Sequence, residues 1–192
     1  MNVVIIDYGA GNIQSIRFAL ERLGVRATLS HDASVIKAAT HVIFPGVGEA
    51  SSAMKKLCAT GLDARIPKLK QPVLGICLAM QLMCTHTEEG NTTGLGIYNT
   101  PVLRFTTNLN VPHMGWNKVS GKGVLFAGID HESHFYMVHS FYAVPNEDLI
   151  GSCSYEVLFA AALEKDNFYG TQFHPEKSGA AGAQLLKNFL AL

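Results

Sequence analysis

Short apolar runs alternate with helix-like segments through the first half of the chain, and this alternation restricts the fold more than any other feature. Residues 3–6, 41–44 and 72–76 are apolar runs of strand length. Residues 13–23 repeat apolar side chains at helical spacing after Asn12, a candidate N-cap. Strands that alternate with helices build a parallel sheet with helices on both faces, so the sequence predicts an α/β fold. The other predicted elements of this half are a strand over 25–29 and helices over 32–38, 49–58 and 77–84.

The pattern changes after about residue 102, where shorter strand-like runs are separated by Gly, Pro, Asn and Asp residues. Strands without intervening helices favour antiparallel pairing in this half. An amphipathic segment over 178–190 predicts a final helix. No repeat, low-complexity tract or charge run marks a linker, so we expect one domain over residues 1–192. The predicted strands of this half cover 102–105, 135–141, 149–153, 157–163 and 168–173.

The composition is typical of a chain with a packed core, at 48% hydrophobic and 16% charged residues. Fifteen basic residues balance fifteen acidic ones, which argues against a nucleic-acid partner. No apolar stretch approaches the roughly 18–20 residues that span a bilayer, and the first residues do not resemble a signal peptide. The four cysteines show no paired spacing, which suits a reducing compartment. We therefore expect a cytoplasmic protein that binds neither nucleic acid nor membrane.

Motifs for nucleotide cofactors and metal ions are missing from the sequence. Gly9 and Gly11 follow the first strand, but Gln14 stands where the third glycine of a dinucleotide fingerprint belongs. There is no GxxxxGK[ST] loop, and neither an HExxH motif nor paired cysteines indicate zinc. His113 and His139 have no partner at a ligand spacing. We expect no cofactor and no metal ion.

Cys77 lies where the apolar run over 72–76 meets the helix that is predicted to follow. The partial positive charge and free N–H groups of a helix N-terminus favour a nucleophilic thiolate. The Leu78 N–H then faces a developing oxyanion, as in the nucleophile elbow of hydrolases. Gln81 shares the helix face of Cys77, so its amide is within reach of a bound substrate. Taken alone, a cysteine that ends an apolar strand is more often a core residue, and a nucleophile requires a partner base.

His174 and Glu176 are the candidates for that base and its orienting group. His174 follows a strand-like run, and clefts form at the carboxyl edge of a parallel sheet. Its imidazole can take and return the thiol proton while Glu176 holds the other ring nitrogen, so Cys77, His174 and Glu176 form a triad by role. In isolation, a His-Pro-Glu sequence is more often only a turn. Gly46 and Gly48 follow another strand at the same edge, and their loop is a candidate second oxyanion donor.

The chain contains the motifs GxCxxxQ at 75–81, HPE at 174–176 and PGVG at 45–48. Together they resemble the class I, triad-type glutamine amidotransferases. Within that family the chain looks like the glutaminase subunits of imidazole glycerol phosphate synthase, because further blocks match over nearly its whole length. Those blocks are residues 7–12, 111–117, 135–140 and 172–178.

The resemblance implies a flavodoxin-like, three-layer fold with a largely parallel central sheet, helices on both faces and some antiparallel strands in the C-terminal half. It implies hydrolysis of glutamine to glutamate and ammonia: Cys77 attacks the carboxamide, His174 protonates the leaving ammonia and Glu176 orients His174. The resemblance also implies that the ammonia passes to a separate (β/α)₈-barrel cyclase subunit, which forms imidazole glycerol phosphate and AICAR in histidine biosynthesis. The remaining family roles are oxyanion binding (backbone of Gly46, Val47, Gly48 and Leu78), substrate binding (Gln81 and the backbone of Ser140 and Phe141), and the subunit interface or ammonia exit (Asn12, Met114, Trp116, Asn117, Tyr136 and Lys177).

Two positions depart from the family pattern. Ala79 replaces the glycine that usually stands two residues after the nucleophile, and Phe141 replaces a common tyrosine. The first change requires room for a methyl group next to the neighbouring strand. We also expect Met114, Trp116 and Tyr136 to be exposed in the isolated subunit, since partner faces carry such anchors.

Three other interpretations stay open at the level of sequence. A peptidase or γ-glutamyl hydrolase uses the same three side chains. A related glutaminase subunit feeds ammonia to a different acceptor. A catalytically silent binding partner retains the fold without the reaction.

Overall fold

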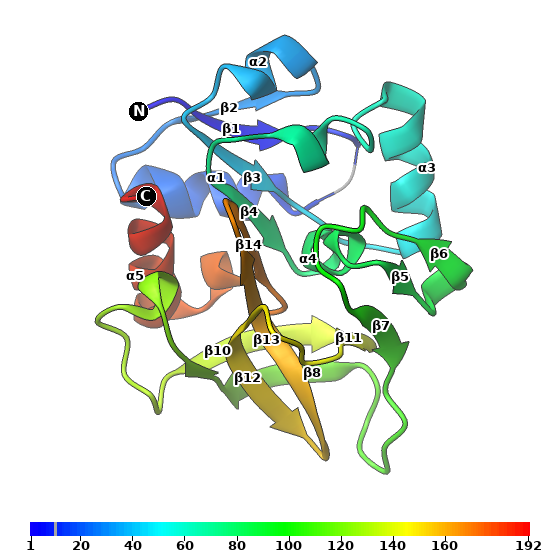
Figure 1. Ribbon diagram of the computed structural model, residues 1–192. Coiled ribbons are helices and arrows are strands. Elements are labelled where there is room, and N and C mark those ends of the chain that lie inside the picture. The colour runs from blue at the N-terminus through cyan, green and yellow to red at the C-terminus, as the bar shows by residue number, and fades with distance from the viewer. Residues whose placement is uncertain (10) are drawn as a thin grey trace.

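A mixed 12-stranded sheet forms the centre of the computed structural model, which describes residues 1–9 and 11–192 (Figure 1). One half of the sheet consists of parallel strands in the spatial order β2-β1-β3-β4-β14, which confirms the predicted parallel sheet. The last of these strands comes from the C-terminal part of the chain and lies beside β4. Ala10, within the 7–12 block, lies outside the described residues. The bounds are β1 (Val3–Ile6), β2 (Ala27–Ser30), β3 (His41–Phe44), β4 (Val73–Ile76) and β14 (Phe168–Thr171).

The other half of the sheet is mostly antiparallel, as predicted. Strand β13 pairs with β14, β11 and β12, and the sheet continues through β7 to β5 and β6. The β5–β7 pair is parallel. Strands β8 and β10 form a separate two-stranded antiparallel sheet, in the lower part of Figure 1. The bounds are β5 (His86–Thr87), β6 (Thr92–Thr93), β7 (Pro101–Arg104), β8 (His113–Lys118), β9 (Ser120–Gly121), β10 (His134–His139), β11 (Phe141–Ala143), β12 (Leu149–Tyr155) and β13 (Val157–Lys165).

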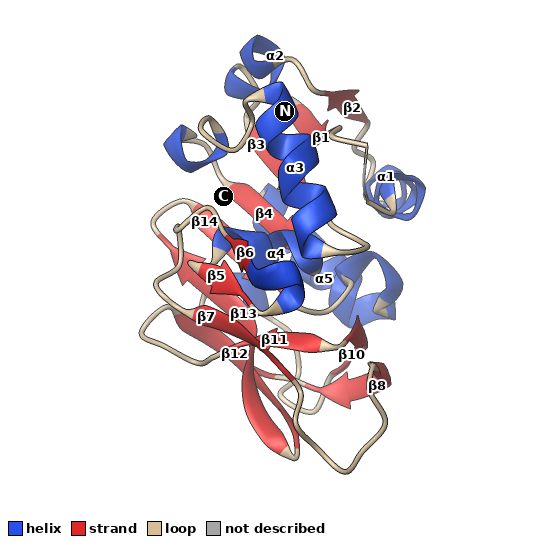
Figure 2. Ribbon diagram, turned by 90° about the vertical axis from the view of Figure 1, so that its right-hand side faces the viewer, coloured by secondary structure: helices blue, strands red, loops and turns tan. Residues whose placement is uncertain are grey.

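Helices cover both faces of the parallel strands and give the fold its three layers. Alternate residues of a strand point to opposite faces, so β1 sends Val3 and Ile5 toward one helical layer and Val4 and Ile6 toward the other. The first layer holds α1 and α5, which lie on the right in Figure 2, and the second holds α2, α3 and α4. Among the described residues, no helix has the length and apolar character to cross a membrane. The bounds are α1 (Ile13–Arg22), α2 (Ala33–Lys37), α3 (Ala50–Thr60), α4 (Leu78–Met83) and α5 (Gly179–Leu190), with 3₁₀ turns η1 (Ile66–Lys68), η2 (Glu89–Asn91), η3 (Val124–Phe126) and η4 (Pro175–Lys177).

The structure differs from the sequence predictions at several points. Strands β5, β6, β8 and β9 have no counterpart among the predicted strands, and two predicted features take another form. Asn12 stands at the N-cap of α1, but its φ of −85° and ψ of 63° lie outside the extended region used by capping residues, and its side chain makes no capping hydrogen bond. Asp32, by contrast, is extended and caps α2 by accepting hydrogen bonds from two backbone N–H groups. The strand predicted over 135–141 is two strands, because the chain changes its pairing partner at Ser140 from β8 to β7.

Candidate active site

Cys77 occupies a sharp bend between β4 and α4, and its backbone is strained. Its φ of 55° and ψ of −111° lie in a region that residues with side chains rarely adopt, which costs about 1–3 kcal/mol. Close packing accompanies the bend, since a Cβ on Gly46 would lie 2.3 Å from the backbone nitrogen of Ala79. Ala79 is itself buried in the core, so the methyl group that departs from the family pattern has room there. This geometry is the strand-to-helix elbow expected from the sequence, with Leu78 as the first residue of α4.

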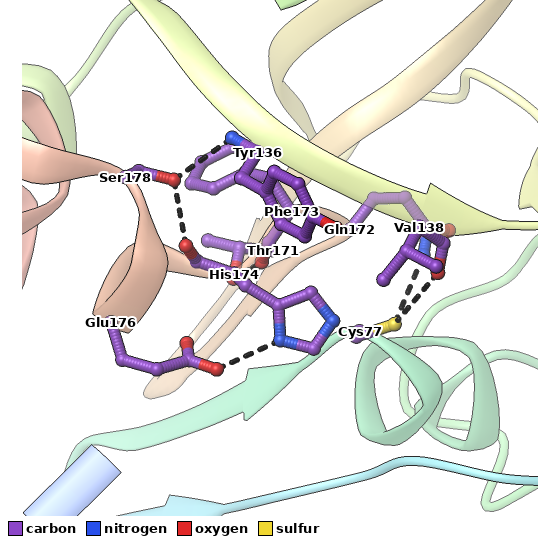
Figure 3. A network of polar contacts seen from close by, with 9 residues as sticks. All are labelled: Cys77, Tyr136, Val138, Thr171, Gln172, Phe173, His174, Glu176 and Ser178. Carbon is purple, nitrogen blue, oxygen red and sulfur yellow. Dashed lines mark hydrogen bonds and ion pairs between the residues drawn. The ribbon is translucent and has the colours of Figure 1, made fainter. Parts of the chain in front are cut away.

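The Cys77 sulfur has two polar neighbours at the long limit of sulfur hydrogen bonds. Its thiol lies 3.9 Å from the Val138 carbonyl oxygen, to which it donates, and the Gln172 side-chain amide donates to the sulfur at 3.8 Å (Figure 3). Neither contact is short enough to hold the sulfur firmly. It therefore remains available to a substrate.

His174 and Glu176 form a buried, hydrogen-bonded pair beside this sulfur. Nδ1 of His174 lies 2.8 Å from Oε1 of Glu176. Figure 3 shows the imidazole between Glu176 and Cys77, with its other ring nitrogen turned toward Cys77. The backbone of His174 is fixed as well, because its N–H donates to the Tyr136 carbonyl at 3.0 Å and its carbonyl accepts from the Ser178 hydroxyl at 2.6 Å. The structure thus brings together three side chains that are widely separated in the sequence.

The charges of this group favour a protonated imidazole. Burial lowers the pKa of His174, but the neighbouring Cys77 side chain and the hydrogen-bonded Glu176 carboxylate outweigh burial and raise that pKa to about 10. An imidazolium next to a cysteine stabilises the thiolate, which is the nucleophilic form. The second carboxylate oxygen of Glu176 has no hydrogen-bond partner among the described residues, so His174 is the group that this carboxylate serves.

A cleft of about 280 Å³ opens beside Cys77 and His174, just below the range of roughly 300–1,000 Å³ that is typical of small-molecule sites. Most of the residues that the sequence assigned to catalysis, the oxyanion or the substrate line it. The exceptions are Gly46, which packs behind the start of α4, and Glu176, which lies behind His174. The lining residues are Val47, Gly48, Cys77, Leu78, Gln81, Glu89, Pro112, Val138, His139, Ser140, Phe141 and His174.

Gln81 is held at the wall of this cleft by two hydrogen bonds. Its side-chain Nε2 donates to the Phe141 carbonyl at 2.8 Å and to the side-chain oxygen of Gln172 at 2.9 Å. An amide nitrogen carries two N–H groups, and both are engaged. The side-chain oxygen of Gln81 is therefore the group that remains for a ligand.

Two residues of the site have no role assigned to them from the sequence. Glu89 lines the cleft from η2, and its Oε2 accepts a hydrogen bond from the Ala50 N–H at 2.9 Å. Burial raises the pKa of Glu89, although this hydrogen bond opposes the rise. Tyr8 donates its hydroxyl proton to the Pro45 carbonyl at 2.8 Å and so anchors the loop after β3. An acidic residue in a turn and a tyrosine after a strand have no spacing that distinguishes them from ordinary surface and core residues.

Apolar and aromatic side chains gather on the outer surface of the β8–β10 sheet. Met114 and Trp116 are 62% and 56% exposed, which confirms their predicted exposure. Tyr136 stands opposite Trp116, with ring centres 6.1 Å apart, and the Lys177 ammonium lies 5.7 Å from the Tyr136 ring centre. Tyr136 is half-buried and not fully exposed, because these two neighbours lie against its ring. Met114, Trp116, Tyr136 and Lys177 are named the docking face below.

Two further residues predicted at the interface or the ammonia exit lie outside the docking face. Asn117 lies on the side of β8 opposite Trp116, and its side-chain Nδ2 donates to the Ser154 carbonyl at 3.0 Å. Asn12 lies half-buried at the start of α1.

Comparisons with known proteins place this geometry in a family. The class-I glutamine amidotransferase family matches residues 4–192. The imidazole glycerol phosphate synthase subunit HisH of Bacteroides fragilis (strain YCH46) is 53% identical over 196 aligned residues, and that of Pectobacterium atrosepticum is 50% identical over 197, each with 100% of both chains covered.

Solved structures resemble the fold over nearly the whole chain. One described as a glutamine amidotransferase has a TM-score of 0.78 at 17% identity and covers 99% of this chain and 98% of that one. PurLQS from Thermotoga maritima has a TM-score of 0.75 at 16% identity, with 99% and 97% covered. At such low identity these likenesses concern the fold alone.

Proposed function

Because the chain belongs to the class-I glutamine amidotransferases, and within them to the imidazole glycerol phosphate synthase HisH subunits, we propose that its triad hydrolyses glutamine and supplies ammonia to a cyclase subunit in histidine biosynthesis. The observation that carries this proposal is the His174–Glu176 pair at 2.8 Å, whose other ring nitrogen is turned toward the Cys77 sulfur at the wall of a cleft. This arrangement supports the roles of nucleophile for Cys77, base for His174 and orienting carboxylate for Glu176.

The first chemical step is attack of the Cys77 thiolate on the carboxamide carbon of glutamine. A bond forms between sulfur and carbon, and the carbonyl oxygen becomes an oxyanion. The Leu78 N–H and the N–H groups of Val47 and Gly48 belong to residues that line the cleft and are the proposed donors to this oxyanion.

His174 then returns its proton to the leaving group. The imidazolium protonates the carboxamide nitrogen, the carbon–nitrogen bond breaks, and ammonia leaves a γ-glutamyl thioester on Cys77. Water next attacks the thioester, with neutral His174 as the base, and glutamate departs as the thiolate is regenerated. Through both steps Glu176 keeps the ring oriented and stabilises its charged form.

The polar groups of the cleft wall suit the free amino acid. The α-amino group of glutamine is a cation, and Glu89 places a carboxylate on that wall, with the Gln81 side-chain oxygen as a second acceptor. A peptide substrate carries an uncharged amide nitrogen at this position, so Glu89 favours a free amino acid over a peptide. The volume of about 280 Å³ supports the same choice.

The docking face is the proposed seat of a (β/α)₈-barrel cyclase. Exposed aromatic and methionine side chains are typical anchors of protein interfaces. Strand β10 carries Tyr136 on this face, and the Tyr136 carbonyl accepts the N–H of His174. A partner seated there lies one strand away from the triad, which supports direct passage of ammonia.

The proposed compartment is the cytoplasm. All four cysteines are free thiols, whereas oxidising compartments favour disulfides. The histidine biosynthesis of the related subunits fits the same location.

The decisive experiment measures glutamate and imidazole glycerol phosphate together, with and without the cyclase subunit of the same organism and its nucleotide substrate. We expect both products from the complex. The Cys77→Ala chain should still bind the cyclase but release no glutamate, and the Cys58→Ala chain, which loses an exposed thiol, should match the wild type. Glutamate without imidazole glycerol phosphate indicates another ammonia acceptor. Binding without glutamate indicates a silent partner.

A further inference from the structure

Two buried histidines that the proposed reaction does not use lie against each other at the cleft. His139 lines the cleft, and its Nε2 is 3.0 Å from Nδ1 of His113. Both rings pack among aromatic side chains, and His113 stacks on Tyr155 with ring centres 4.0 Å apart. Within residues 1–9 and 11–192, no group of three or more His, Cys, Asp or Glu side chains is placed to hold a metal ion. The pair therefore requires another explanation.

The surrounding hydrogen bonds fix which nitrogen of each ring carries the proton. Nδ1 of His139 lies 2.8 Å from the Phe141 carbonyl, which only accepts, so this nitrogen is protonated. Nε2 of a neutral His139 is then an acceptor, and it faces Nδ1 of His113, which must donate. Nε2 of His113 consequently accepts, and the Asn117 Nδ2 lies 3.3 Å from it.

The contacts of Asn117 support the same assignment of protons to the two histidine rings. Its Nδ2 also donates to the Ser154 carbonyl, and its side-chain oxygen accepts from the Lys118 N–H at 2.8 Å. A reversed amide would lose both contacts, so the amide nitrogen faces His113. Burial lowers the pKa of His139 to about 3 despite its hydrogen bond to Phe141, which keeps that ring neutral.

This series of hydrogen bonds ends at the Phe141 carbonyl, which also contacts a proposed substrate-binding residue. The Phe141 carbonyl accepts from both His139 and the Nε2 of Gln81. With that carbonyl fixed, the Gln81 nitrogen is held toward it and the Gln81 side-chain oxygen is left for a ligand. Hydrogen bonds thus connect Asn117, His113 and His139 to a group on the cleft wall.

We propose that His113 and His139 are positioning residues for glutamine: a neutral pair, each protonated at Nδ1, that fixes the Phe141 carbonyl and through it the Gln81 amide. This inference rests on the proposed glutaminase function and adds to it the residues that set substrate affinity. Neither histidine touches the reacting atoms. Their loss should therefore raise KM and leave kcat nearly unchanged.

Steady-state kinetics of the cyclase complex with three His139 variants test the pair. Asn places an N–H where Nδ1 of histidine lies, so His139→Asn keeps the donor to Phe141, and its KM should stay within about twofold of the wild type. His139→Gln and His139→Phe lose that donor, and their KM should rise about five- to tenfold with kcat within about twofold. His31→Asn, at an exposed loop histidine, is the matched control and should leave both parameters unchanged. Thermal unfolding of every variant records any loss of folded protein.

The outcomes separate the two proposals. If His139→Phe keeps the wild-type KM, the ring only fills space and the positioning role is wrong. A higher KM for His139→Asn than for His139→Gln overturns the proton assignment. Absence of glutamate release from the wild-type complex overturns the proposed function and this inference together, whereas equal KM values with normal wild-type turnover overturn this inference alone.

A measurement on the wild-type protein tests the proposal even if the variants fail to fold. Long-range proton–nitrogen correlation spectra of ¹⁵N-histidine-labelled protein distinguish protonated from unprotonated ring nitrogens. We expect His113 and His139 each to show a protonated Nδ1 and an unprotonated Nε2 at neutral pH. A protonated Nε2 on either ring contradicts the proposal.

Discussion

Cys77 is set apart from the other cysteines by its surroundings. Burial raises the pKa of Cys84 far above its ordinary value and that of Cys153 to about 12, so both remain thiols at neutral pH. Burial and the neighbouring Asp63 also raise the pKa of Cys58. A nucleophile must be a thiolate, and Cys77 is the cysteine that lies beside His174, an imidazole whose own pKa is raised.

Replacing Glu176 with Gln removes a charge that keeps His174 protonated. The folded pKa of His174 is about 10, above an unfolded value of about 6.5. Protonation therefore stabilises the native state fully below about pH 6.5, and this contribution is lost as the pH rises to about 10. Glu176→Gln should lower stability by about 1–3 kcal/mol near pH 6.5, by much less near pH 10, and should reduce turnover at least about tenfold. Thermal unfolding of both proteins across this range tests the assignment, and a difference that grows with pH contradicts it.

Site residues that directly follow a predicted strand could be identified from the sequence. Cys77 and His174 follow apolar runs, and strands that are buried on both faces are readable as such runs. Glu89 and Tyr8 reach the site through tertiary packing: Glu89 through a turn that contacts the start of α3, and Tyr8 through a hydroxyl that contacts the next loop. No periodicity encodes either contact, so neither contact could be predicted from the sequence.

At the level of elements, β3 and β8 show why prediction succeeds for one strand and fails for another. β3 is buried throughout and coincides with its predicted range, 41–44. β8 exposes Met114 and Trp116 while it buries His113, which reverses the usual alternation of buried apolar and exposed polar residues. The cause we propose for this reversal is the partner that covers the docking face. The alternation of apolar and polar residues assumes that the exposed face of a strand meets water. It therefore cannot identify a strand whose exposed face is covered by a partner protein.

The loop after β3 packs against α4 through Gly46. We therefore expect Gly46→Ala to push this loop away from the start of α4. The added Cβ would lie 2.3 Å from the Ala79 nitrogen, and the loop must move away from the elbow. Loss of its oxyanion donors should reduce kcat about 10²- to 10³-fold, with a stability loss of about 1–3 kcal/mol. Gly61→Ala is the matched control: it strains the left-handed C-cap of α3, where φ is 66°, far from the cleft. It should lose stability but keep its turnover per folded molecule. Equal kcat values for the two variants refute this role of the loop.

At the level of the whole molecule, the order of strands brings the triad together. Strand β14 lies beside β4 in parallel, so Cys77, which follows β4, and His174, which comes soon after β14, lie where the carboxyl ends of two neighbouring strands meet. The local pattern of apolar residues predicts the strands, but it contains no information on which strands pair with each other in the sheet. The triad could be inferred only because the carboxyl ends of all parallel strands lie on the same side. The β8–β10 sheet, one hydrogen bond from His174, extends this site to the surface.

Trp116→Ala should weaken cyclase binding without destabilising the subunit. The ring is 56% exposed in the isolated chain and central among the apolar residues of the docking face, so its loss should raise the Kd for the cyclase at least about thirtyfold. Stability should change by no more than about 0.5 kcal/mol, as at other exposed positions. The matched control is Leu29→Ala, at a leucine that is 40% exposed on β2, an edge strand of the 12-stranded sheet, which contains neither β8 nor β10. Binding of each variant by titration calorimetry, together with its thermal unfolding, separates the two effects. If the Kd rises equally for both variants, or if Trp116→Ala lowers stability as much as a core substitution does, the aromatic face is a structural element of the fold and the cyclase must bind elsewhere.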